Sequence, residues 1–244
     1  MKKIPMVHKK LAAVLLFILL AGCFLLGVWY TGERKAVKKS VYKNGTVQYN
    51  IFYNKRKEIK QMVERGLDLN DPDQSASMAP LTMAIDALDR DSMYGMVDFL
   101  IGQGASVNTD YPAENDIVFR RRTPLYEAVS FGDKKLFRQL LKAGADPGYR
   151  DKDGTTPLMF ACYMANGNVD QDTVDIIRSL FIAGADPSVI NKDGKTAEDY
   201  FEMGRRNIEK DMKTNRLTDE EKKQSRRYLG KIRVLLDQAV SSRR

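Results

Sequence analysis

The sequence predicts an all-α fold in which pairs of helices repeat and stack into a solenoid. Three observations support this prediction. Four apolar stretches end in a glycine, and these glycines are Gly66, Gly104, Gly144 and Gly184. Pro-Leu pairs precede the last three stretches, and two of their prolines, Pro124 and Pro157, are 33 residues apart. Apolar residues between each proline and its glycine recur at the three- and four-residue spacing of a helix.

The start and the end of each expected helix carry recognisable signals. Thr123 and Thr156 precede prolines, so each threonine can cap a helix whose first turn needs no proline amide donor. Gly144 and Gly184 are expected to end the second helix of a pair in a left-handed turn. Six residues of the first helices are expected to face the neighbouring repeat: Leu125, Ala128, Val129, Leu158, Ala161 and Cys162.

This pattern resembles the ankyrin repeat, a unit of about 33 residues with a Thr-Pro-Leu-His-x-Ala signature. The resemblance covers residues 48–210 and implies an ankyrin-repeat solenoid of about four to five repeats. The chain departs from the signature because Thr82, Tyr126 and Met159 stand where histidine is usual. Extra residues are expected as loops over 109–122 and 163–172.

A long helix is predicted at the end of the chain, within residues 211–244. Thr218 and Glu221 have the spacing of a capping box. The helix is expected to reach about Val240 and to cover the end of the stack. Its expected apolar face consists of Tyr228, Ile232, Leu235 and Leu236.

The first residues resemble an export signal. Lysines precede an apolar run, and residues 20–23, Leu-Ala-Gly-Cys, resemble the lipobox of bacterial lipoproteins. That resemblance implies a signal peptide over 1–22, lipidation of Cys23 and a tether over 23–47. The alternative is an uncleaved membrane anchor over residues 11–30, which carry no charge. Both interpretations place the repeats on the periplasmic face of a bacterial membrane.

Charge and composition argue against several kinds of chemistry. The chain carries a formal charge of +8, but residues 44–203 hold 18 Lys/Arg against 25 Asp/Glu, a net −7. Residues 204–244 hold 13 against 6, a net +7. His8 is the only histidine, so the repeats have no residue for a Ser-His-Asp triad. We therefore expect that the chain is not an enzyme and that it binds no cofactor, metal, nucleic acid or small-molecule substrate. A hydrolase would instead need an ordered acid pair such as Asp153 and Asp193.

Partner-binding residues are expected at the ends of the first helices and at the hairpin tips, as the ankyrin resemblance implies. The first-helix positions are Asp86, Ser130, Phe131, Tyr163 and Met164. The hairpin and loop positions are Phe119, Arg120, Arg122, Lys152 and Asp153.

The combined layout resembles ankyrin-repeat lipoproteins encoded beside type VI secretion phospholipase effectors. That resemblance implies an immunity protein that binds a lipase toxin in the periplasm and neutralises it. A periplasmic scaffold for an endogenous envelope protein is the alternative.

Overall fold

The computed structural model describes residues 45–71, 79–109, 123–163, 169–213 and 217–241. Cys23 and both expected membrane segments lie outside these residues. The chain divides into residues 1–49 and residues 50–244. Within the described ranges every regular element is an α-helix, which confirms the predicted all-α class.

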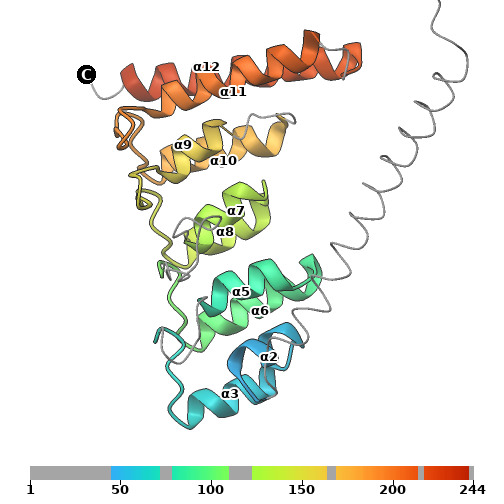
Figure 1. The fold of residues 1–244 in the computed structure, drawn as a ribbon, viewed down its shortest axis with the longest axis vertical. Helices are drawn as coiled ribbons and strands as arrows, with labels where there is room; N and C mark the ends of the chain where they lie inside the picture. Colours follow the sequence, from blue (N-terminus) through green and yellow to red (C-terminus); the bar gives the residue numbers. More distant parts are fainter. Residues whose placement is uncertain (1–44, 72–78, 110–122, 164–168, 214–216, 242–244) are drawn as a thin grey trace, which may run out of the picture. The chain divides into compact units, whose positions relative to one another are not determined.

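Ten helices are described, and Figure 1 labels them in chain order. Their bounds are α2 (Val47–Phe52), α3 (Arg56–Glu64), α5 (Pro80–Ala87), α6 (Arg90–Gly102), α7 (Pro124–Ser130), α8 (Lys134–Lys142), α9 (Pro157–Tyr163), α10 (Gln171–Ile182), α11 (Ala197–Lys213) and α12 (Asp219–Ser241).

Helix pairs stack in two layers within residues 50–244 (Figure 1). The first helices α5, α7, α9 and α11 contact one another in sequence, and α8, α10 and α12 form the second layer. Each first helix also packs on the second helix of its own pair. This is the predicted ankyrin-repeat solenoid with a helix at its C-terminal end.

The expected helix signals are confirmed. Thr123 Oγ1 accepts a hydrogen bond from Tyr126 N at 3.4 Å, and Thr156 Oγ1 accepts one from Met159 N at 3.2 Å. Gly144 has a φ of 90°, so an L side chain would be strained at this helix end. The six residues expected to face the next repeat are all buried, including Cys162.

Two of the three residues that replace the usual histidine, Tyr126 and Met159, make buried apolar contacts, and Thr82 is half-buried. Tyr126 is 2% exposed, and its ring lies 4.7 Å from that of Phe160 in the next repeat. Met159 is fully buried. An apolar contact between repeats therefore takes the place of a histidine hydrogen bond here.

The last helical pair begins at two capping boxes. Thr218 N donates to Glu221 Oε2 at 2.7 Å and Glu221 N donates to Thr218 Oγ1 at 3.3 Å, as predicted. Thr196 and Asp199 form the same reciprocal pair at the start of α11.

The buried face of α12 differs in part from the expected one: Ser225, Leu229, Ile232 and Leu236 are buried. Tyr228 and Leu235 are half-buried.

Candidate functional site

An exposed aromatic residue lies at the turn between α7 and α8. Gly132 adopts a φ of 61°, and the buried carboxylate of Asp133 accepts a hydrogen bond from Leu136 N at 2.9 Å, which caps α8. Phe131 directly precedes Gly132 and is 51% exposed, although it is a large apolar side chain.

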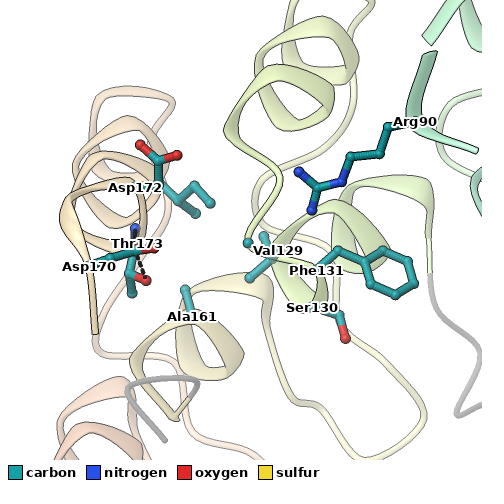
Figure 2. A pocket seen from close by; sticks show the side chains of 10 residues that line it. Arg90, Val129, Ser130, Phe131, Ala161, Asp170, Asp172 and Thr173 are labelled. Atoms are coloured by element: carbon teal, nitrogen blue, oxygen red, sulfur yellow. Dashed lines mark hydrogen bonds between the residues drawn. The ribbon is translucent and has the colours of Figure 1, made fainter. Parts of the chain in front are cut away.

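A pocket of about 360 Å³ lies beside this turn, among α6, α7, α9 and α10. Val129, Ala161 and Ile176 supply its apolar lining. Figure 2 shows the guanidinium group of Arg90 on one side and Asp172 on the opposite side, with Val129 and Ala161 between them. The pocket thus combines an apolar floor with opposite charges at its edges.

The acidic side of the pocket is held by bonds at the start of α10. Asp170 caps this helix, because its Oδ1 accepts from both Thr173 N at 2.8 Å and Thr173 Oγ1 at 2.9 Å. Lys134 on α8 contacts Asp172 and Asp175, so an ion-paired cation joins two successive repeats.

These contacts shift the pKa of the groups that make them. The hydrogen bond to Asp172, followed by the one to Asp175, raises the pKa of the Lys134 ammonium group. Burial pushes the pKa of Asp175 upward, but hydrogen bonds from Gln171 and Lys134 outweigh it and lower that pKa. Both residues therefore stay charged near neutral pH.

The basic side of the pocket is formed by Arg90. Arg90 begins α6, is exposed, and makes no ion pair within the described ranges. Its neighbour Asp89 instead caps α6 by accepting from Ser92 N at 3.0 Å. An exposed guanidinium group at this place can pair with an anionic group that approaches the pocket.

The predicted partner-binding residues occupy different places. Ser130 and Phe131 line the pocket. Tyr163 lies at the end of α9, where its ring meets that of Tyr200 at 6.0 Å, and Asp86 lies half-buried near the end of α5. Lys152 and Asp153 belong to the turn between α8 and α9.

Four predicted residues lie outside the described ranges: Phe119, Arg120, Arg122 and Met164.

Sequence reasoning missed the other half of the pocket. Asp170 and Thr173 had a detectable signal, since Asp-x-x-Thr before an apolar stretch is typical of a helix start. Arg90 had none, because it reaches the pocket from the preceding repeat, 39 residues before Val129 in the chain.

A second pocket, of about 460 Å³, lies between α6 and α8. It is lined partly by Gln139, whose Nε2 donates to Asp98 Oδ1 at 2.6 Å and to the carbonyl of Tyr94 at 3.0 Å. Those bonds join α6 to α8, so the lining already serves the packing of two repeats. The pocket beside Phe131 is therefore the better candidate site.

The described ranges hold no cluster of three His, Cys, Asp or Glu side chains that could bind a metal ion. None of the helices in this part of the chain has the length and apolar character needed to cross a membrane.

Comparison with known proteins identifies the repeats. Residues 87–191 match the family of ankyrin repeats, in three copies. An ankyrin repeat protein of Fowlpox virus (strain NVSL) is 26% identical over 133 residues, which are 54% of this chain and 83% of that protein.

Two further relatives are much longer than this chain. An ankyrin repeat protein of Acanthamoeba polyphaga mimivirus is 29% identical over 124 residues, covering 50% of this chain and 16% of that protein. The human SH3 and multiple ankyrin repeat domains protein 2 is 32% identical over 101 residues, covering 41% of this chain and 5% of that protein.

The helix pairs within residues 87–191 thus match ankyrin repeats, a family that generally serves in protein–protein interaction.

Proposed function

We propose that this ankyrin-repeat solenoid binds a protein partner through the pocket beside the α7–α8 turn. One observation carries the proposal: a half-exposed phenylalanine lines a pocket with an apolar floor, and the pocket rim holds an exposed arginine that makes no ion pair with the described residues. Aromatic residues and arginine are enriched at protein interfaces and dominate their binding energy.

Phe131 and Arg90 have complementary roles in this proposal. An apolar side chain of the partner covers the exposed Phe131 ring, which removes apolar surface from water. A carboxylate of the partner pairs with Arg90. On the far side, the carboxylate of Asp172 already holds Lys134, which also pairs with Asp175.

For the partner itself, we propose a type VI secretion phospholipase toxin, which the chain neutralises as an immunity protein on the periplasmic face of a membrane. Support comes from the sequence, where residues 1–23 resemble a lipoprotein signal. A tether of this kind raises the concentration of the inhibitor at the lipid surface that the toxin attacks.

The test has two parts, both with the full chain. Co-expression with a lipase encoded beside it is expected to protect cells that export the toxin to the periplasm. Phe131→Ala and Arg90→Ala are each expected to weaken binding about 10- to 100-fold, as substitutions at interface hot spots do.

Ile182→Ala is the matched control, since Ile182 is an exposed apolar residue away from the pocket, at the end of α10. A protein that binds the lipase equally well without Phe131 would contradict the pocket as binding surface. A growth defect on deletion in cells that lack any toxin would instead favour an endogenous envelope partner.

A further inference from the structure

The outward face of the last helical pair carries six exposed cations. None of them makes an ion pair with the residues that the structure describes. Three lie on α11 and three on α12: Arg206, Lys210, Lys213, Lys223, Arg226 and Arg227. We call this surface the basic end face.

The bonds between α11 and α12 place these cations level with one another. Arg233 on α12 pairs with both Glu198 and Glu202 on α11. The two helices run antiparallel, so the residue six positions before Arg233 on α12 lies level with the residue six positions after the midpoint of Glu198 and Glu202 on α11. Arg227 is therefore level with Arg206, and one turn further along Lys223 is level with Lys210.

The helix faces explain why the cations point outward. Phe201 and Ile208 are buried on the side of α11 that packs against α9. Ile232 and Leu236 are buried on α12, which packs against α10. The exposed cations occupy the opposite sides of both helices and therefore lie at the end of the stack.

Acidic residues of this pair are mostly engaged elsewhere. Arg205 holds Glu202 and Glu209, and its hydrogen bond is the main cause of the lowered pKa of Glu202. Glu221 is used in the capping box with Thr218. The exposed acids of α12 lie toward its ends, where Asp219 pairs with Lys222.

We propose that the basic end face docks on the anionic headgroups of a phospholipid membrane. Each lysine or arginine near such a surface strengthens membrane binding about fivefold. The α12 part of the face continues into Gly230 and the half-exposed Val234, without an aromatic residue. Protein interfaces favour aromatic anchors, whereas a lipid surface needs only distributed positive charge.

This inference rests on the membrane tether of the proposed function. A hydrophobic anchor and a basic patch together hold a protein on a membrane more firmly than either alone. Docking would occupy the end of the stack and leave the pocket beside Phe131 open, because that pocket is formed by α6, α7, α9 and α10.

A fluorescent probe on the basic end face tests the proposal. Gly230 is exposed and a side chain there meets no atom within 4 Å, so Gly230→Cys can carry the probe. The labelled full chain is placed in nanodiscs of phosphatidylcholine alone or with phosphatidylglycerol, and the same chain without Gly230→Cys supplies the background. The probe is expected to report contact with lipid only in the anionic nanodiscs. High salt is expected to abolish this contact, because it screens the attraction between the cations and the headgroups.

The triple variant Lys223→Gln, Arg226→Gln, Arg227→Gln is expected to lower the ratio of docked to free protein about 100-fold. The matched control removes three exposed cations away from this face: Arg138→Gln, Lys142→Gln, Arg150→Gln.

Equal signals in neutral and anionic nanodiscs, or an unaffected triple variant, would overturn the proposal. So would a triple variant that loses only its binding to the lipase, since the face would then serve a protein partner. Failure of the tether is distinguishable, because the chain would then not enter neutral nanodiscs at all.

Discussion

Asn108 joins its own repeat to the next one through two hydrogen bonds. Its Nδ2 donates to the carbonyl of Gly144 at 3.1 Å, and its Oδ1 accepts from Asp146 N at 2.8 Å. Asn70 repeats this arrangement one unit earlier, with the carbonyl of Gly104 and with Ser106 N. A single amide side chain thus satisfies a helix-end carbonyl and a loop amide of the following repeat.

Asn108→Ala is expected to lower the free energy of unfolding by about 1–2 kcal/mol, because two hydrogen bonds between repeats are lost. Urea denaturation followed by circular dichroism measures the change. Gln238→Ala on the exposed side of α12 is the control and is expected to change stability little. An unchanged midpoint for Asn108→Ala would mean that water replaces both bonds without cost.

The asparagine position is occupied by Gly148 in the next repeat, so the series of bonds stops there. Gly148 has no positive φ, and a Cβ would meet only the flexible carboxylate of Asp146, at 3.3 Å. Gly148→Ala is expected to stabilise the protein by about 0.5–1 kcal/mol, because alanine lowers the conformational entropy of the unfolded chain. The Gly148→Asn variant is expected to be more stable than the Gly148→Ala variant, because the asparagine amide can reach the next repeat. Equal stability of the two variants would show that no such bond forms.

Tyr94 holds the cap of α8 from the neighbouring repeat. Its hydroxyl donates to Asp133 Oδ2 at 2.7 Å. Burial, and then the hydrogen bond to Asp133, raise the pKa of Tyr94 to about 12 from its usual 10.0. Tyr94→Phe is expected to lower the free energy of unfolding by about 1–3 kcal/mol, since a buried carboxylate loses a donor.

The same bond makes stability depend on pH in the alkaline range. Because the folded pKa is the higher one, the contribution of Tyr94 is complete below pH 10 and is lost as pH rises toward 12. The wild type is therefore expected to lose more stability than Tyr94→Phe between these values. Parallel urea curves at several pH values check this, and identical pH profiles would contradict it.

Cys162 is expected to resist thiol reagents while the protein is folded. Its side chain is fully buried, and burial, with a smaller effect of Glu198, raises the pKa of the thiol. In a Cys23→Ala background the labelling rate should follow unfolding in urea. Phe131→Cys provides the exposed comparison and should react at once. Rapid labelling of native Cys162 would show that α9 opens locally.

Much of the fold was predictable because its signals are local. A proline after threonine starts a helix, a glycine after an apolar stretch ends one, and both types of signal act within a few residues of the chain. The capping box at Thr218 and Glu221 could be identified for the same reason. The inner face of α12 was predicted less well, since Leu229 rather than Tyr228 is buried against the stack.

The sequence by itself determined the repeating helix pairs, their caps and the burial of Cys162. Only the tertiary structure placed Arg90 beside Phe131, linked Asn108 to Asp146 and set Arg227 level with Arg206. Each of these relationships joins residues that lie far apart in the chain. Their distances depend on how one helix pair stacks on the next, which packing of buried side chains decides and local sequence patterns do not record.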